Sequence, residues 1–573
     1  MGVLEHNCCF PTDEGYFFVV SANSNQKVGH LLKVVCDDLK AAGHSLLLKD
    51  IRLYKANIST TPKQDILQRT REWLYVQPAE ARLHAFQELE DLFPDGPPKG
   101  KLHIIIANTE ALAHCLDCMA AGPSPSATVA NTQHVAAFFG DQGFGCVDRI
   151  PVAIFSPPLA RLERRIDILE QVPASKAKID RAGSLLSKLI GFCKDENERR
   201  SLIKSDIDSL VGEPGQWETS IPGAKSKPDA VWWHGDFPCT VLRLKNLSGV
   251  GGNPVIQGMI DFSKIISSKK LQAVHARGVC NFPVLIVGVS GNRIRVSAAI
   301  FLGRIYVTTL FALDLSSGFH ISETIVQLAR VFEAVSMCHS ELKSFYTQVS
   351  RSSEATFSAI LPNPTSARGE SLPSLTYRRF MTRTGQPTST ITDLQNMTTA
   401  MYIAVLESTG CEVVVKFTAR YNEHAHRKLA DAGLAPKLHF CGRVVGNVYM
   451  VIMDRVMGKS IWQLLEEKVD IPPIVSEKVE EALSILHENN IVFGDLRENN
   501  VVYGSSEGLE KGHAFLVDFD WAGTDGVDRY PASLNEANDW EDSVSPYGIM
   551  QKTHDTWQLD RLKGLCTRRG MPI

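Results

Sequence analysis

The stretch LHENNIVFGDLRENNVVY, residues 486–503, decides the fold and chemistry that this sequence predicts. It places Asp495 five residues before Asn500, and the following apolar segment HAFLVDFD puts Asp518 at the end of an expected strand. Phosphoryl transfer from a metal-bound nucleotide needs one carboxylate that orients the acceptor hydroxyl. It also needs an amide and a second carboxylate that hold metal ions against the phosphates. The order and spacing of these three side chains therefore predict phosphoryl-transfer chemistry.

Candidates for nucleotide binding lie upstream of this stretch. Lys416 ends the apolar strand VVVK, a place from which a lysine can hold the α- and β-phosphates. Glu423 begins the helical segment EHAHRKLADAG, either as the partner of Lys416 or as an acidic residue favoured by the helix dipole. Met453 lies in NVYMVIMDRVMGKSIWQLL, which is typical of a strand and connector along an adenine edge or of a core strand and surface helix. Asp555, in a later helical segment, is expected to support the Asp495 loop from behind.

The C-terminal part, residues 375–573, resembles the protein-kinase-like superfamily and specifically its divergent fungal kinase-like domains. The resemblance rests on VVVKF, HRKLADAGLAPKL, GDLRENNV, LVDFDWAG and RYPASLN…HDTWQLD. It implies a two-lobed fold that binds ATP with Mg²⁺, with Asn500 and Asp518 as metal ligands. It further implies that Asp495 is the base-like residue and that Arg497 contacts the transferred phosphate.

Three departures from the kinase pattern keep a second interpretation open. Phe493 and Gly494 stand where protein kinases have His and Arg, a form closer to small-molecule phosphotransferases. Asp520 replaces the glycine of D-F-G and adds a charge beside the expected metal site. The segment TGQPTSTITDLQNMTTAMYIAV contains no G-x-G-x-x-G, so its backbone is not expected to lie closely on the phosphates. Nucleotide or protein binding without turnover is therefore the alternative.

Composition describes an ordinary globular protein of two to four domains. The chain has 573 residues, of which 44% are hydrophobic and 22% charged, and its net charge of −4 gives no global attraction to nucleic acid or anionic membrane. No apolar run approaches the roughly 18 residues that a membrane span needs, and the N-terminus lacks the features of a signal peptide. Cys115 and Cys118 form one CxxC without a second pair, so reduced thiols in a cytosol-like compartment are expected.

The N-terminal segment, residues 1–108, predicts a small β-grasp-like domain. A strand at 16–20 precedes a helix whose apolar residues recur every three or four positions from Val28 to Leu39, and strands follow at 51–54 and 102–106. The segments KVGHLLKVV, DIRLYKANI and LEDLFPDGPPKGKLHIII resemble the leading domain of the Crinkler effector family. That resemblance implies a ubiquitin-like translocation or trafficking module and final residence inside a target cell. A general ubiquitin-like interaction domain is the alternative.

Linkers are expected at 109–149 and 349–374, on either side of a middle domain, residues 150–348. This domain has helices near its start and end and a β-rich block between them, and it resembles the restriction-endonuclease-like domain of fungal Crinklers. Asp229, Lys245 and Gln257 fit the nuclease pattern, but Arg243 occupies the position of its glutamate. A fixed positive charge there should repel a metal ion that two carboxylates would otherwise hold. The sequence therefore predicts a degenerate nuclease-like domain.

Together these observations predict a multidomain α+β protein, a Crinkler-like effector that combines a ubiquitin-like N-terminal domain, a degenerate nuclease-like domain and a kinase-like domain. The primary hypothesis is an ATP-dependent kinase that phosphorylates Ser or Thr of a protein, with host proteins as partners and nucleic acid not favoured. A pseudokinase that binds host proteins is the alternative, and a metal-dependent nuclease is a third. The family resemblance implies a secreted protein that acts in the host cell, and without it an intracellular soluble protein is expected.

Overall fold

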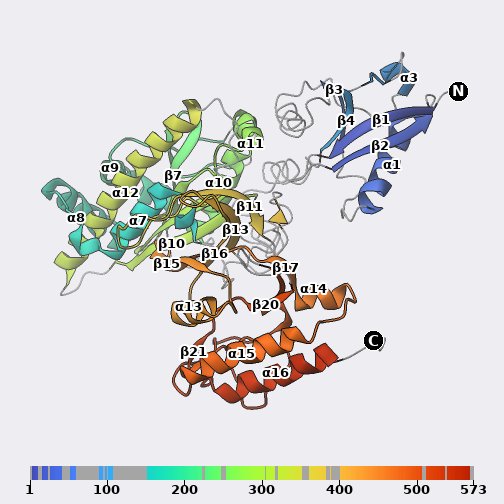
Figure 1. The fold of residues 1–573 in the computed structure, drawn as a ribbon. Helices are drawn as coiled ribbons and strands as arrows, with labels where there is room; N and C mark the ends of the chain where they lie inside the picture. The colour runs from blue at the N-terminus through green and yellow to red at the C-terminus, as the bar shows by residue number, and fades with distance from the viewer. Residues whose placement is uncertain are drawn as a thin grey trace. The chain divides into compact units, whose positions relative to one another are not determined.

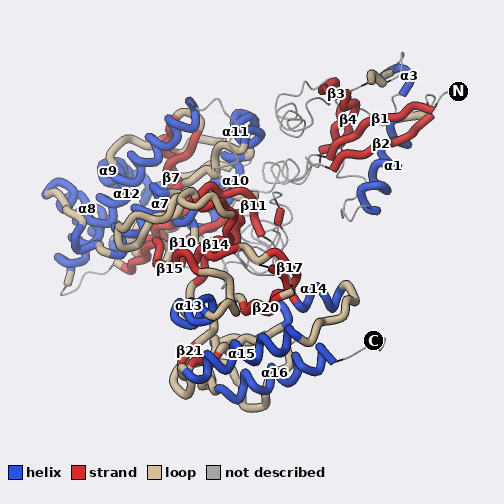
Figure 2. The backbone as a smooth tube through the Cα atoms, in the orientation of Figure 1, coloured by secondary structure: helices blue, strands red, loops and turns tan. Residues whose placement is uncertain are grey.

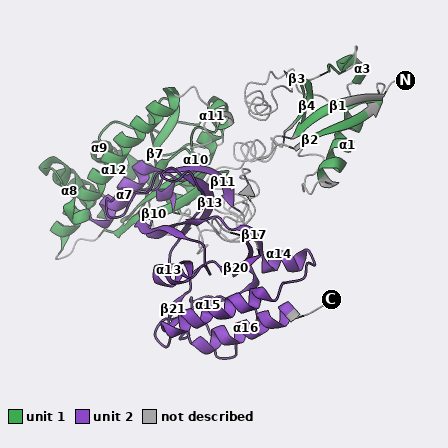
Figure 3. Cartoon of the chain, in the orientation of Figure 1, with its two compact units in different colours: residues 1–145, 169–360, 389–392 green, residues 146–168, 361–388, 393–573 purple. Residues whose placement is uncertain are grey.

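The computed structural model divides the chain into two compact units (Figures 1 and 3). The first comprises residues 1–145, 169–360 and 389–392, and the second comprises residues 146–168, 361–388 and 393–573. The structure describes residues 3–10, 16–23, 26–41, 52–59, 89–93, 97–99, 101–107, 151–221, 226–246, 253–303, 305–315, 320–351, 361–381, 387–388, 400–505, 512–535 and 538–567. The CxxC pair, the linker at 109–149 and residues 384–386 and 389–399 of the expected phosphate loop lie outside these residues.

The N-terminal part of the first unit is a four-stranded sheet with a helix packed on it (Figure 2). The strands have the order β2-β1-β4-β3, in which β1 runs parallel to β4 and antiparallel to β2. The apolar positions of the predicted helix are buried in the core of this sheet, so its periodicity is confirmed. Strand β1 was not predicted. The elements are β1 (Val3–Phe10), β2 (Tyr16–Asn23), α1 (Val28–Ala41), β3 (Arg52–Ser59), α3 (Leu89–Leu92) and β4 (Lys101–Ala107).

The larger part of the first unit is a six-stranded sheet covered by helices on both faces. Its order is β10-β9-β8-β7-β6-β5, and only β7 and β8 run parallel, joined through α10. Leu242 and Leu244 of β7 join a core with α8, α9 and α12, while the alternate residues Val241 and Arg243 face Gly258 of α10.

The strands expected from the sequence are present in this sheet, whereas strand β5 and helices α8, α10 and α11 were not predicted. The strands are β5 (Gln216–Trp217), β6 (Ala230–His234), β7 (Phe237–Lys245), β8 (Val284–Ser290), β9 (Arg293–Phe301) and β10 (Ile305–Asp314). The helices are α8 (Lys176–Ile190), α9 (Glu196–Val211), α10 (Pro254–Ile266), α11 (Gln272–Arg277) and α12 (Ile321–Arg351).

The second unit begins with an antiparallel sheet of order β12-β11-β13-β14-β16-β15. Helix α13 follows the third long strand, β14, and Asn422 caps it by accepting a hydrogen bond from the backbone N–H of Ala425. The elements are β11 (Leu375–Met381), β12 (Pro387–Thr388), β13 (Ala400–Leu406), β14 (Glu412–Thr418), α13 (Glu423–Asp431), β15 (Leu438–Val444) and β16 (Val448–Asp454).

A mainly helical part follows this sheet in the chain, and one continuous apolar core joins the two parts. Helices α15 and α16 pack against each other, and short strands connect them to the loop that carries Asp495. The elements are β17 (Met457–Ser460), α14 (Ile461–Glu466), α15 (Ile474–Glu488), β18 (Ile491–Val492), η10 (Glu498–Asn500), β19 (Val501–Ser505), β20 (His513–Leu516), β21 (Gly523–Thr524) and α16 (Lys552–Thr567).

Two segments from distant parts of the sequence, 151–168 and 361–370, form a collar on the edge strand β15. The first carries η5 (Val152–Ile154) and α7 (Pro157–Asp167). The backbone N–H of Asn363 donates to the carbonyl oxygen of Ile154 over 2.7 Å, and that of Val445 donates to the carbonyl oxygen of Thr365 over 2.9 Å. The apolar residues Ala153, Ala160 and Val445 pack together. Segments 146–168 and 361–374 therefore belong to the second unit, while the five-part domain division stays a prediction.

Candidate active site

Asp495 lies in the loop between β18 and η10, where two hydrogen-bonding groups fix its position. The amide nitrogen of Asn500 donates to the backbone oxygen and to Oδ2 of Asp495, each over 2.9 Å. From behind, the carboxylate of Asp555 on α16 accepts hydrogen bonds from the backbone N–H groups of Phe493 and Gly494 over 2.7 and 2.8 Å. The predicted support by Asp555 is confirmed, and the Asp495 carboxylate is held on a rigid loop.

The residues that depart from the kinase pattern before Asp495 have a structural reason. The backbone at Gly494 has a φ of +78°, and a Cβ atom there would lie 2.2 Å from Cε of Met550. The left-handed conformation favours glycine over the arginine that the pattern would place at this position, whereas the end of the flexible Met550 side chain can move. The Phe493 ring meets the Phe519 ring edge-on, with the centroids 5.5 Å apart, and so packs the loop against the segment of Asp518. The substitutions change the support of the loop and leave Asp495 in place.

Lys416 is buried on β14 and contacts two carboxylates. Its Nζ lies 2.7 Å from Oδ1 of Asp518 and 2.8 Å from Oδ2 of Asp520. Burial lowers the pKa of Lys416, but the charges of the two carboxylates outweigh it and leave the pKa above its ordinary value. Burial and the charge of Asp518 raise the pKa of Asp520 to about 7. Asp520, which the sequence presents as a missing glycine and an added charge beside the metal site, is therefore a direct partner of the lysine.

Asp518 has the unusual backbone φ of +70°, a left-handed conformation that costs energy for a residue with a Cβ atom. The following Phe519 is fully buried and stacks on His426 of α13, with ring centroids 4.6 Å apart. The backbone N–H of Asn422 also donates to the carbonyl oxygen of Phe519 over 3.1 Å. These contacts hold the strained residue and direct its carboxylate to Lys416.

Glu423 does not pair with Lys416 in this structure, so the pairing interpretation is corrected. Its carboxylate accepts a hydrogen bond from Nε of Arg427, one helical turn later, over 2.8 Å. The reason is local: the side chain lies at the exposed start of α13, while Asp518 and Asp520 occupy the positions around Nζ of Lys416. Met453 is buried in the shared core at the end of β16. Its role beside an adenine stays a prediction.

The Asp495 carboxylate is paired with Arg497. Nη2 of Arg497 donates to Oδ2 of Asp495 over 2.6 Å, and Nε lies 2.5 Å from Oδ1. Burial, together with the nearby charge of Asp518, raises the pKa of Asp495 to about 6 although Arg497 opposes the shift. Asp495, Arg497, Asn500, Asp518 and Lys416 are therefore assembled at one place, as the sequence predicts.

The expected nuclease residues are also brought together, but basic side chains already neutralise their carboxylates. Arg200 donates to Oδ1 of Asp229 through Nε over 2.8 Å and through Nη2 over 2.5 Å. Arg243 forms a two-point ion pair with the buried Asp261, with Nη2 2.7 Å from Oδ1, and its Nη1 lies 3.8 Å from Asp229. Among the described residues, no group of three or more His, Cys, Asp or Glu side chains is placed to hold a metal ion.

The remaining two residues of that pattern lie near this network. Nζ of Lys245 lies 3.2 Å from Oε1 of Glu196, at the start of α9, and Gln257 is fully buried on α10. Sequence reasoning missed Glu196, Arg200 and Asp261, because nothing local connects them to Asp229. The charged helix start at Glu196 was their only sequence signal. The sequence shows the positive charge at Arg243, but its partner Asp261 was not predicted.

Comparisons with known proteins address the N-terminal part most directly. Residues 5–107 match the Crinkler effector protein N-terminal domain. This match covers the four-stranded sheet and its helix. No curated protein matches the chain. None of the described helices is long and apolar enough to cross a membrane.

Among solved structures, the chain is similar to the kinase PK-1 of Cydia pomonella granulovirus, at 18% identity and a TM-score of 0.24. That alignment covers 29% of this chain and 63% of the viral kinase.

Proposed function

We propose that the second unit transfers the γ-phosphate of ATP to a Ser or Thr hydroxyl of a protein, within a Crinkler-like effector that acts in a host cell. The observation that carries the proposal is the gathering of Lys416, Asp495, Asn500 and Asp518 from distant parts of the sequence. The setting agrees with a two-lobed kinase-like fold, because Lys416 lies on the third long strand and α13 follows directly. The sheet order β2-β1-β4-β3 likewise supports a ubiquitin-like N-terminal domain.

The donor atoms fit Mg²⁺ and ATP. Asn500 gives its amide nitrogen to Asp495, and no described residue donates to its amide oxygen, which leaves an oxygen ligand beside the carboxylate of Asp518. Mg²⁺ takes oxygen ligands and is typically held by one or two carboxylates together with substrate phosphates. Bound Mg·ATP would supply the phosphoryl group and neutralise its charge.

Each side chain then has a defined task. Lys416, already held by Asp518 and Asp520, is directed to the place where the α- and β-phosphates bind. Asp495, whose pKa of about 6 leaves it mainly ionised at neutral pH, accepts the proton of the acceptor hydroxyl. Arg497 holds the carboxylate in position and carries a positive charge beside the transferred phosphate.

Phosphate transfer from radiolabelled ATP by the full chain tests this proposal. Asp495→Asn should lower the rate by about 100- to 10,000-fold, because the amide keeps the shape of the carboxylate but cannot accept the proton. The matched control is Asp470→Asn at an exposed loop position, which should retain the parental rate. Equal rates in the Asp495→Asn variant and the parent protein would contradict the assigned role.

Nucleotide binding without turnover is the second candidate, and the pairing of Lys416 with Asp520 and of Glu423 with Arg427 favours it. Thermal unfolding with and without Mg·ATP shows whether the second unit binds nucleotide, which both candidate functions require. At a nucleotide concentration of 100 times Kd, binding should stabilise the second unit by about 2.7 kcal/mol. Stabilisation without any phosphate transfer would support the binding role. No shift at millimolar Mg·ATP would contradict both candidates.

A further inference from the structure

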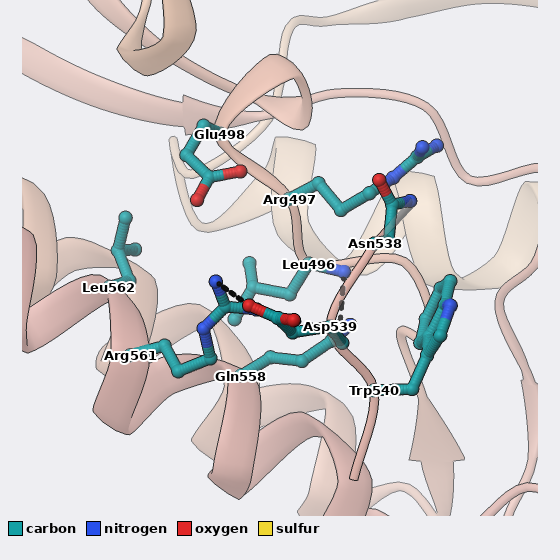
Figure 4. A pocket seen from close by; sticks show the side chains of 9 residues that line it. All are labelled: Leu496, Arg497, Glu498, Asn538, Asp539, Trp540, Gln558, Arg561 and Leu562. Atoms are coloured by element: carbon teal, nitrogen blue, oxygen red, sulfur yellow. Dashed lines mark hydrogen bonds and ion pairs between the residues drawn. The ribbon is translucent and has the colours of Figure 1, made fainter. Parts of the chain in front are cut away.

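A pocket with about 200 Å³ of free space lies beside the loop of Asp495 (Figure 4). Its walls come from this loop, from the segment before Trp540 and from α16. The lining residues are Leu496, Arg497, Glu498, Asn538, Asp539, Trp540, Gln558, Arg561 and Leu562. The three residues that follow Asp495 line the pocket, whereas Asp495 itself does not. The pocket therefore lies beside the position of the acceptor hydroxyl and would hold a neighbouring group of the same acceptor.

Two carboxylates and two guanidinium groups line the pocket, and their pairing leaves one carboxylate, that of Glu498, to accept a cation. Glu498 is half-buried, and within the described part of the chain its carboxylate has no ion-pair or hydrogen-bond partner. The nearby guanidinium of Arg497 points away from Glu498, as Figure 4 shows, and is occupied by Asp495. Asp539 adds a second carboxylate, which Arg561 contacts over 3.0 Å at the exposed side. Glu498 is therefore the carboxylate with which a positively charged group of the acceptor would form an ion pair.

The other walls suit a long aliphatic stem. Leu496 and Leu562 are buried apolar residues of the lining. The indole of Trp540 is fixed by stacking on Trp521, with centroids 5.9 Å apart, and by its Nε1–H donating to the carbonyl oxygen of Asn535. Lysine and arginine combine such a stem with a cationic head, and they bury the stem along apolar surface while the head reaches a polar partner.

We propose that this pocket binds a lysine or arginine side chain that flanks the phosphorylated residue of a protein acceptor. The inference rests on the function proposed above and adds a substrate class to it. Glu498 follows Asp495 by three residues, and a chain spans at most about 3.6 Å per residue, so the basic residue lies within about three positions of the acceptor hydroxyl. The cationic head pairs with Glu498, and Asp539 lies within the same lining as a second acceptor.

A peptide series tests this inference on the full chain. Each peptide carries one Ser in a neutral background, with Lys, Arg, Ala or Glu placed in turn at the three positions on either side. The parental protein should phosphorylate the best Lys or Arg peptide with a kcat/KM about tenfold above that of the Ala peptide, as one partly buried ion pair allows. A Glu peptide should be the poorest acceptor.

The assignment to Glu498 is tested by Glu498→Gln, which should lower the ratio of basic to neutral peptide to about one, mainly through KM. Glu498→Lys should reverse the order and favour the Glu peptide. The matched control Glu488→Gln, at the exposed end of α15, should keep the parental ratio. Thermal unfolding verifies that each variant is folded.

Two outcomes are informative in different ways. Equal phosphorylation of all peptides by the parental protein, or a preference for Glu, overturns the pocket assignment while the kinase function stands. No phosphate on any peptide or protein overturns the kinase function and this inference with it.

Discussion

The chain contains two clusters of buried carboxylates and basic side chains, and they differ in the kind of cation that neutralises them. Around Asp229 the cations are the guanidinium groups of Arg200 and Arg243, which stay charged at every accessible pH and form two-point contacts. At Asp518 the cation is a single lysine ammonium on a flexible stem. At Asp229 and Asp261 these forked, permanently charged partners occupy the carboxylates that would hold a metal ion, whereas Lys416 can exchange its carboxylates for phosphate oxygens. The same residue classes therefore give one site that is closed and one that can accept a ligand.

The largest effect is expected where the closed site is opened. Arg243→Met leaves Asp261 buried without its two-point partner, and an unpaired buried charge costs about 3–5 kcal/mol. Urea unfolding of the full chain, followed by Trp fluorescence of the first unit, measures the loss. Lys270→Met, which removes an exposed ion pair to Asp236, is the control and should cost less than about 1 kcal/mol. A decrease of less than about 1 kcal/mol in the free energy of unfolding of Arg243→Met would mean that the ion pair of Arg243 and Asp261 does not close the site.

The second test compares the two lysines. Lys416→Met should lower phosphate transfer by about 100- to 1,000-fold, since it removes the cation that holds the nucleotide phosphates. Lys245→Met should leave the transfer rate unchanged. Plasmid nicking in Mg²⁺ or Mn²⁺ is measured on the same proteins, and none is expected from the parent. Nicking that disappears in Lys245→Met would show that the middle site is an active nuclease and that the contrast between the two clusters is wrong.

A smaller effect is expected in the N-terminal sheet, where the described residues give a buried histidine no counter-charge. His6 is fully buried, and neither of its ring nitrogens has a hydrogen-bond partner among the described residues. Burial, and to a lesser extent the charge of the nearby His103, lowers the pKa of His6 to about 4. The unfolded chain protonates this histidine below about pH 6.5, whereas the folded sheet keeps it neutral down to about pH 4. The free energy of unfolding therefore has its full value above pH 6.5 and decreases between pH 6.5 and pH 4. The loss at pH 5 should be about 2 kcal/mol.

Hydrogen exchange of the β1 amides at pH 7.5 and pH 5, after correction for intrinsic rates, measures this loss in the full chain. His6→Phe should remove most of the pH dependence. The control is His30→Gln at an exposed position, and this variant should keep the pH dependence of the parent protein. Equal protection at the two pH values in the parent would contradict the assignment.

The sequence predicted what depends on local pattern. Helices α1 and α9 follow from their periodicity and charged start, and the buried strands β8 and β9 follow from continuous apolar runs. Strand β1 was missed because its apolar residues are interrupted by His6 and Asn7, whose surroundings come from distant parts of the chain: Asn7 bonds to β4 and His6 packs against Phe93. Helix α10 was missed because its stretch was interpreted through the nuclease pattern alone.

The candidate site divides in the same way. The spacing of Asp495, Asn500 and Asp518 is local information, and the structure brings these residues together. The contact of Lys416 with Asp520 and the close approach of Met550 to Gly494 join residues far apart in the chain. No local pattern encodes such pairs, so sequence reasoning noted Asp520 and Gly494 only as departures.

The collar on β15 also has a consequence for how the protein is made. Ala153 and Ala160 find their apolar partner in Val445, which emerges from the ribosome roughly 290 residues later, a delay of about 15–60 s at ordinary synthesis rates. During that interval the first part of the collar, residues 151–168, has been synthesised without β15, the strand that it packs on. The six-stranded sheet of residues 216–314, which lies between the two collar segments in the sequence, can already fold. The second unit is therefore completed last, after the domain that lies between its two parts in the sequence.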